Sequence, residues 1–142
     1  MTESLAHLDA DPRVTWTRDV LRYGDTDANG HINNSTFSVL CESGRVTLFR
    51  ERVTPHLPPD AFVVIVRLVI EYKAELFYPG EVCTATWVSA VGRTSMTVKQ
   101  ALFSGETLVA TGEGVCVLMD GASRRPLALP PAVREALAGA MR

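Results

Sequence analysis

The feature that most limits how this chain can fold is a series of strand-like segments joined by very short links. Apolar residues alternate from Phe62 to Tyr72, and three more strand-like segments follow between residues 81 and 119. The links between the last three segments contain only "GR" and "SGE". Links this short require neighbouring strands to be antiparallel. The second half of the chain therefore predicts an antiparallel sheet.

In the segment before these strands, the apolar residues recur with a different period. From Ser35 onward, apolar residues recur at helical spacing, and charged residues fill most of the remaining positions. The pattern predicts a helix of roughly 18 residues, about 27 Å long, that ends before Pro55. A first strand is expected ahead of this helix in "RVTWTRDVLRY". The tail "LPPAVREALAGAM" predicts a short helix that starts at Pro130 or Pro131.

The predicted order is strand, long helix, four antiparallel strands, short helix. One long helix is packed most economically against about five strands if the sheet curls around it and buries its apolar stripe. We therefore predict an α+β fold of two layers. Such a sheet leaves an edge strand exposed, which favours pairing with a second copy of the chain.

Length and composition narrow the function classes. A chain of 142 residues suits one core, and we expect residues 1–12 to be a flexible arm before a single domain at 13–142. With 46% hydrophobic residues, 21% charged residues and a net charge of −2, the chain is typical of a globular protein, and no nucleic-acid partner is expected. No apolar run approaches the ~18 residues of a membrane helix, and the N-terminus lacks the pattern of a secretory signal. We expect a cytoplasmic protein without a membrane partner.

The cysteines and histidines indicate neither a disulfide framework nor a metal site. Cys41, Cys83 and Cys116 are odd in number, far apart and set among apolar residues, which is typical of buried free thiols. The three histidines lack the i, i+4 spacing that builds a metal site on a helix. No metal is therefore expected.

The segment "RYGDTDANGHINN" concentrates polar residues between the first strand and the long helix. Asn33 or Asn34 suits the helix N-cap, where an asparagine side chain accepts a hydrogen bond from a free backbone N–H group. If the segment is extended, Asp27, Asn29 and His31 occupy alternate positions and project the same way, toward the start of the helix.

This polar segment carries the chemistry needed to hydrolyse an acyl group. A helix N-terminus supplies free N–H donors and a partial positive charge, so the backbone N–H near Asn34 suits a tetrahedral oxyanion. Asp27 can act as nucleophile or general base, and Asn29 with His31 can orient water or the carboxylate. The alternative is that these are ordinary turn and capping residues, with Gly30 supplying a positive φ. The residues alone leave both alternatives open.

The block "RYGDTDANGHINNSTF" followed by "LCESGR" resembles the hot dog fold thioesterases, in particular the hydroxybenzoyl-CoA thioesterase-like family. Members of that family follow roughly R-[FY]-x-D-x-D-x-x-G-x-x-x-N-x-x-[YF], with E-x-x-R in the helix. The order of elements is similar over about residues 13–140. The resemblance implies an acyl-CoA or acyl-ACP thioesterase without metal or cofactor, acting as a homodimer or homotetramer. It also implies that the second acid of D-x-D, Asp27, carries the chemistry.

A second likeness concerns the spacing D-A-N-G-H-I-N-N. It is similar to the D-x-N-x-H-V-N-N of plant acyl-ACP thioesterases, where the aspartate, asparagine and histidine have active-site roles. This likeness implies such roles for Asp27, Asn29 and His31. A later glutamate in that group follows a strand tyrosine by three residues, as Glu75 follows Tyr72. The two resemblances differ, because hydroxybenzoyl-CoA enzymes lack the asparagine and histidine.

Three further residues have a structural and a functional interpretation. Glu42, on the predicted helix, can contribute to the site or form an ion pair with Arg45 or Arg50. Thr94 and Ser95, at a strand start, can contact the thioester or its pantetheine arm, or can bond to the local backbone.

Two other functions are also open for the same fold, an enoyl-thioester hydratase or dehydratase and a non-catalytic acyl-CoA binding protein.

Overall fold

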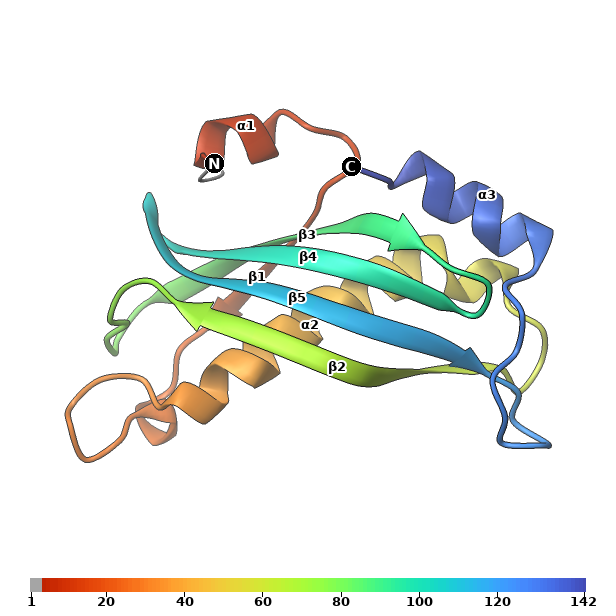
Figure 1. Cartoon of the computed structure of the whole chain (residues 1–142). Helices are drawn as coiled ribbons and strands as arrows, with labels where there is room; N and C mark the ends of the chain where they lie inside the picture. Colours follow the sequence, from red (N-terminus) through yellow and green to blue (C-terminus); the bar gives the residue numbers. More distant parts are fainter. Residues whose placement is uncertain (1–3) are drawn as a thin grey trace.

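The computed structural model describes residues 4–142. In this part of the chain, five strands form one antiparallel sheet in the order β1-β3-β4-β5-β2, and the long helix α2 packs on one of its faces (Figure 1). The elements in chain order are α1 (Leu5–Asp9), β1 (Thr15–Val20), η1 (Tyr23–Asp25), α2 (Asn34–Arg52), η2 (Thr54–His56), β2 (Phe62–Tyr72), β3 (Glu81–Val91), β4 (Ser95–Ser104), β5 (Thr107–Met119) and α3 (Pro131–Gly139). The predicted α+β fold, with one long helix against five antiparallel strands, is confirmed.

The helix α2 begins where the sequence predicts a cap. The side-chain oxygen of Asn33, the N-cap, accepts from the Ser35 N–H at 3.0 Å. The helix is 19 residues long and buries its apolar stripe against the sheet. The buried residues on this stripe include Phe37, Leu40, Cys41, Gly44 and Leu48.

Gly44 allows α2 to approach the sheet closely. A Cβ atom at this position would lie 2.5 Å from both Gln100 Nε2 and Thr86 Oγ1. Gln100 is almost completely buried, and its Nε2 donates to the Cys41 carbonyl oxygen at 2.8 Å and to Thr86 Oγ1 at 3.0 Å. Because residue 44 has no side chain, this polar contact between helix and sheet can form inside the core.

The region expected to be a flexible arm contains a short helix. Ser4 Oγ caps α1 by accepting from the His7 N–H at 3.3 Å, and Leu8 is fully buried. Leu8 packs with Val14 and Trp87 on the sheet face away from α2. A helix of 5 residues is too short to show a period in the sequence, and tertiary packing stabilises it instead. Residues 1–3 of the expected arm lie outside the described residues.

The C-terminal residue, Arg142, is hydrogen-bonded to the segment that follows α1. The Arg142 N–H donates to the Val88 carbonyl oxygen at 2.8 Å, and Arg142 Nε donates to Asp11 Oδ2 at 2.8 Å. The Arg142 guanidinium also lies 5.0 Å from the centre of the Trp87 ring. Arg13 donates to the same carboxylate, and these hydrogen bonds hold the pKa of Asp11 well below its usual range. The last residue of the chain therefore lies beside the segment between α1 and β1 (Figure 1).

The cysteines largely follow the prediction of buried free thiols. All three are free, and burial raises the pKa of Cys41 and of Cys116 to about 11. Cys83 is only half-buried, because it lies on the sheet face away from α2, which is less fully covered.

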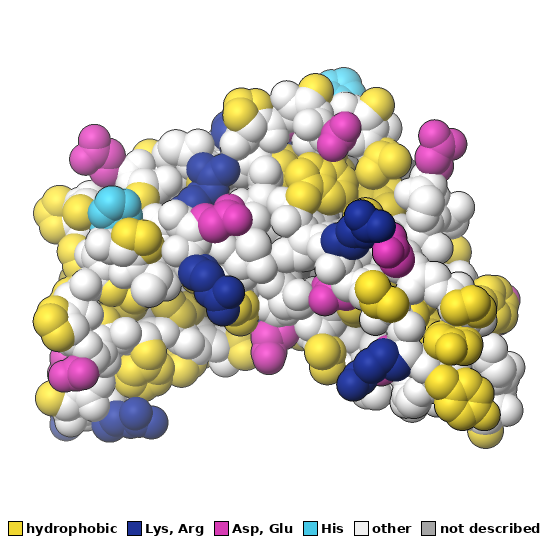
Figure 2. All heavy atoms as spheres, turned by 180° about the vertical axis from the view of Figure 1, so that it is seen from behind, with side chains coloured by type: hydrophobic (Ala, Val, Ile, Leu, Met, Phe, Trp, Pro, Cys, Tyr) yellow, Lys and Arg dark blue, Asp and Glu magenta, His cyan; other side chains and the backbone are white. Residues whose placement is uncertain are grey.

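The molecular surface mixes charges of both signs. On the face shown in Figure 2, lysine and arginine side chains are interspersed with acidic ones, so no continuous basic surface forms there. None of the helices between residues 4 and 142 is both long and apolar enough to cross a membrane.

Candidate active site

The polar segment at residues 26–32 is a tight turn and not the extended stretch assumed in the sequence analysis. A bridge joins its two ends, and the Asp27 N–H donates to the His31 carbonyl oxygen at 2.9 Å. Asp27 Oδ1 accepts from the Asn29 N–H at 2.8 Å, and Gly30 has a φ of 84°. Because the segment turns back on itself, alternate residues do not share one face. Asn29 is exposed and contacts Asp27 through its backbone N–H.

The turn brings Asp27 and His31 together. His31 Nδ1 lies 3.4 Å from Asp27 Oδ2 and 3.2 Å from the Ile32 carbonyl oxygen. Both neighbours are hydrogen-bond acceptors, so in a neutral imidazole the proton lies on Nδ1 and Nε2 is left as the acceptor. The two side chains are 24% and 21% exposed, so a substrate or water can reach the pair. This arrangement provides an imidazole base that a carboxylate orients.

The start of α2 provides a backbone donor. The Asn33 side-chain oxygen accepts a hydrogen bond from the Ser35 N–H, and the Asn33 carbonyl oxygen accepts one from the Thr36 N–H at 3.0 Å. No acceptor in residues 4–142 meets the Asn34 N–H. A free donor at the N-terminus of a 19-residue helix also experiences the positive end of the helix dipole. The Asn34 N–H is therefore suited to bind an oxyanion.

A cavity of about 300 Å³ opens beside these groups. It is lined by His31, Ile32, Asn34, Phe37, Tyr72, Lys73, Ala74, Glu75 and Leu76. Three residues singled out from the sequence, His31, Asn34 and Glu75, thus share one cavity. Asp27 does not line it and meets it only through His31.

The aromatic wall of this cavity was not predicted from the sequence. The rings of Phe37 and Tyr72 are in edge contact, with centroids 5.1 Å apart and an interplanar angle of 87°. The Tyr72 hydroxyl donates to the Asn34 carbonyl oxygen at 3.4 Å, which ties the end of β2 to the start of α2. The available signal was the position of Tyr72 as the last residue of an alternating strand, three residues before Glu75.

Two of the expected supporting residues lie near the C-terminal end of α2, far from the candidate site. Thr94 is the last residue of the link between β3 and β4, and Ser95 is the first residue of β4. The neighbouring Met96 packs with Leu48, in the C-terminal half of α2, whereas the candidate site adjoins the N-terminal half. Within one copy, therefore, neither hydroxyl is near the Asn34 N–H.

Glu42 is exposed on α2, outside the cavity. Neither of the ion pairs suggested by the sequence forms, because no ion pair among the described residues joins Glu42 to Arg45 or Arg50. The i, i+3 spacing to Arg45 is suitable, but Arg45 extends into the core while Glu42 stays at the surface. Arg50 lies eight residues, about 12 Å, farther along the helix, which is too far for an ion pair.

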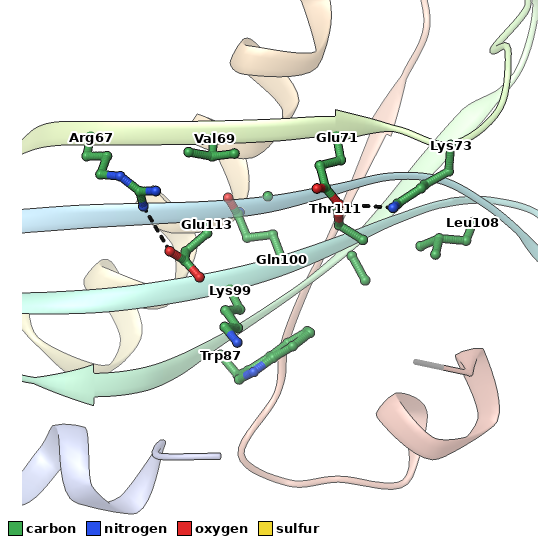
Figure 3. Close-up of a pocket in the computed structure, with 12 residues that line it drawn as sticks. Arg67, Val69, Glu71, Lys73, Trp87, Lys99, Gln100, Leu108, Thr111 and Glu113 are labelled. Atoms are coloured by element: carbon green, nitrogen blue, oxygen red, sulfur yellow. Dashed lines mark hydrogen bonds and ion pairs between the residues drawn. The ribbon is translucent and has the colours of Figure 1, made fainter. Parts of the chain in front are cut away.

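A larger cavity of about 600 Å³ lies on the sheet face away from α2 (Figure 3). Most of its charged groups are paired with one another. Arg67 Nη1 lies 2.9 Å from Glu113 Oε1, and Lys73 Nζ lies 2.9 Å from Glu71 Oε2. Because this cavity contains neither a helix N-terminus nor the aspartate–histidine pair, we place the candidate active site at the smaller one.

Residues 4–142 contain no group of three or more His, Cys, Asp or Glu side chains arranged to hold a metal ion.

Comparison with known families identifies the fold. The thioesterase-like superfamily matches residues 21–137, which include the turn, α2 and strands β2 to β5. The chain belongs to this superfamily. Membership supports a thioester hydrolase in general and confirms the resemblance to hot dog fold thioesterases. No curated protein matches the chain.

Solved thioesterase structures share this fold. A predicted thioesterase from Bacillus stearothermophilus is 29% identical with a TM-score of 0.83, over 91% of this chain and 97% of that one. A thioesterase superfamily protein from Jannaschia sp. CCS1 is 26% identical with a TM-score of 0.83, over 96% and 89%. The DHNA-CoA thioesterase of Staphylococcus aureus, 22% identical with a TM-score of 0.76 over 88% and 89%, shows a likeness of fold alone.

Proposed function

We propose that this protein hydrolyses an acyl-CoA to a free acid and CoA. The observation that carries the proposal is the unpartnered Asn34 N–H at the start of α2, in the same cavity as His31, whose imidazole contacts Asp27 at 3.4 Å. A thioester carbonyl bound against that N–H would have its oxygen stabilised as negative charge develops. Membership of the thioesterase-like superfamily supports the reaction class.

In this proposal Asp27 acts as general base or as nucleophile. As a base, the Asp27–His31 pair takes a proton from water while the water oxygen attacks the thioester carbon. The tetrahedral oxyanion rests on the Asn34 N–H, then the C–S bond breaks and the CoA thiolate takes up the proton. As a nucleophile, an Asp27 oxygen attacks the carbonyl carbon, CoA leaves, and water hydrolyses the anhydride. The position of His31, between the cavity and Asp27, favours the base route.

Glu75 and Asn29 support this chemistry in different ways. Glu75 lies in the cavity with His31, so we assign it a role in holding water or the thioester. The Asn29 backbone N–H holds Asp27 Oδ1 at 2.8 Å and so orients the other carboxylate oxygen, Oδ2, toward His31. The reaction needs protein groups and water, with no metal and no cofactor besides the CoA of the substrate, and we expect it to take place in the cytoplasm.

We also propose that the enzyme is a homodimer, or a homotetramer built from such dimers, joined through β2. This strand is 11 residues long and occupies an edge of the sheet. Its exposed apolar side chains are Ile65, Val66, Val69 and Tyr72. An unpaired edge with apolar side chains is a template for pairing with another chain.

Such pairing also gives Thr94 and Ser95 a route to the site. A two-fold axis makes the two β2 strands antiparallel, so the start of β4 in one copy lies toward the α2 N-terminus of the other. Val64 of β2 and Ser95 of β4 both pair with Val117 of β5, so β2 and β4 start at the same end of the sheet. In this arrangement the active site is completed between subunits.

Release of free thiol from a panel of acyl-CoAs tests the proposed reaction. The panel should include short, medium and long acyl groups, one aryl group, and the matching acyl-ACP thioesters. We expect saturable thiol release from at least one acyl-CoA. A hydratase would instead consume an enoyl-CoA without releasing thiol, and a binding protein would retain the intact thioester. Absence of thiol release across the whole panel would contradict the proposal.

A further inference from the structure

Arg45 is a buried cation that forms no ion pair with any residue between 4 and 142. It is 6% exposed, and its Nη1 is buried with no hydrogen-bond partner in residues 4–142. The thiols of Cys41 and Cys116 lie close enough to experience its charge, but burial raises the pKa of each to about 11, so neither is an anion at neutral pH. A buried guanidinium without an acceptor is strongly unfavourable. We therefore expect its partner to come from outside the described part of the same chain.

The Arg45 side chain runs toward the free edge of the sheet. Arg45 Cδ and Ile65 Cδ1 each lie 3.5 Å from the position that a Cβ on Gly114 would take. Ile65 belongs to the edge strand β2, so this flank of α2 faces the edge. The opposite flank faces β1, where Ser43 Oγ donates to Asp19 Oδ1 at 3.2 Å.

Glu42 provides the complementary charge on the same helix. It is exposed and has no ion-pair partner among the described residues. Val39 and Val46, about one turn before and after it, are 62% and 44% exposed. An unpaired acid between exposed valines, next to an unpaired sheet edge, has the composition of a surface that a protein partner covers.

We propose that Arg45 pairs with Glu42 of the partner subunit when two copies join through β2, and that Glu42 pairs with the partner's Arg45. A two-fold axis makes every such contact reciprocal, because the same residues meet in exchanged roles. The two α2 helices run antiparallel across the axis. The segment Glu42-Ser43-Gly44-Arg45 of one copy therefore lies antiparallel to the same segment of the other copy, which brings Glu42 opposite Arg45. One contact, made twice, neutralises both buried arginines and makes the surface specific for a second copy of this chain. The pairing rests on the dimer proposed above.

A charge-exchange experiment tests the pairing. Glu42→Arg gives chains with two positive charges, and Arg45→Glu gives chains with two negative charges. Each variant alone should form dimers with a Kd raised about tenfold or more, measured by sedimentation equilibrium. An equimolar mixture should recover dimers of near wild-type stability, because each chain then meets the opposite charge in its partner. Glu51→Arg, on the same helix, is the matched control and should leave the Kd unchanged.

The mixture separates this proposal from an ion pair within one helix. An intrachain pair would not be restored by mixing, since each chain would still carry two like charges. Circular dichroism checks that each variant is folded. If Arg45→Glu does not fold, Glu42→Gln and Arg45→Gln replace the pair; each should raise the dimer Kd, and the double variant should raise it no further.

The outcomes distinguish the pairing from the proposals it rests on. A wild-type protein that sediments only as a 15.5 kDa monomer overturns both the dimer and the pairing. A wild-type dimer whose variants dissociate but are not rescued by mixing overturns the pairing alone. Thiol release is measured separately and reports on the hydrolase.

Discussion

Nδ1 of His31 lies 3.4 Å from Asp27 Oδ2 and, on the same side of the ring, 3.2 Å from the Ile32 carbonyl oxygen. Two acceptors at one nitrogen determine which tautomer the imidazole adopts. In the proposed mechanism the carboxylate therefore has two tasks, since it orients the base and also holds the turn through the Asn29 N–H. Mutations at these residues can separate the two tasks.

Asp27→Asn should lower kcat by about 10²-fold or more and leave the fold intact. The amide oxygen of asparagine can still accept from the Asn29 N–H, so the turn is kept while the charge is lost. Thiol release and circular dichroism provide the measurements. Asp9→Asn, the same chemical change at an exposed residue of α1, should keep wild-type activity. A folded and fully active Asp27→Asn protein would remove Asp27 from the mechanism.

Asp25→Ala should act on stability. Asp25 Oδ2 accepts from the Arg22 N–H at 2.8 Å and Oδ1 from Arg22 Nη2 at 3.0 Å, and these hydrogen bonds lower the pKa of Asp25. Loss of both contacts should lower the free energy of unfolding by about 1 kcal/mol. Denaturant unfolding measures this loss. The folded fraction should retain its kcat, and a large drop in kcat at unchanged stability would speak against a structural role.

His31→Ala should reduce kcat with little change in KM, because the imidazole acts on water or the carboxylate and not on substrate binding. His31→Asn tests the alternative that His31 only shapes the turn, since asparagine can replace a local hydrogen bond. We expect His31→Asn to stay slow even where its melting temperature recovers. Wild-type turnover in this variant would leave Asp27 as the sole catalytic side chain.

Acid should loosen the contact between the chain ends. The pKa of Asp11 is lowered, chiefly by hydrogen bonds from Arg13, so its ionised form stabilises the folded state. This contribution is complete above the unfolded aspartate pKa of about 3.9 and is lost as the pH falls below it toward the lower folded value. Unfolding free energies measured between about pH 5 and pH 2 should therefore fall more steeply for wild type than for Asp11→Asn. Parallel curves would contradict the assignment.

The major elements could be predicted because their signals are local and repeated. Alternation along β2 and the two-residue link "GR" leave few ways to pair the strands, and a 19-residue amphipathic helix is hard to mistake. The helix α1 could not be predicted. Its 5 residues are held by the burial of Leu8 against strands that are distant in the chain.

The residues of the candidate site could be proposed from the sequence, whereas their arrangement could not. The motif predicted a shared role for Asp27 and His31, and their side chains lie 3.4 Å apart. The assumption of an extended segment was wrong, because the Asp27 side chain and Gly30 close a turn. The aromatic wall of Phe37 and Tyr72 forms only when β2 meets α2, so no local pattern indicates it. The ion pair suggested between Glu42 and Arg45 does not form, because Arg45 is buried and Glu42 is exposed.

Gly44 makes the active site sensitive to a position far from it. The residue lies ten positions after Asn34 along α2, which corresponds to a lever arm of about 15 Å. A side chain at 44 would press on Gln100 and Thr86 and tilt the helix about that point. A tilt of about 4° moves the Asn34 N–H by about 1 Å, a displacement that is enough to reduce turnover about 10²-fold in well-aligned sites. The alignment of the proposed oxyanion donor, the Asn34 N–H, thus depends on the absence of a side chain at Gly44 in the middle of the core.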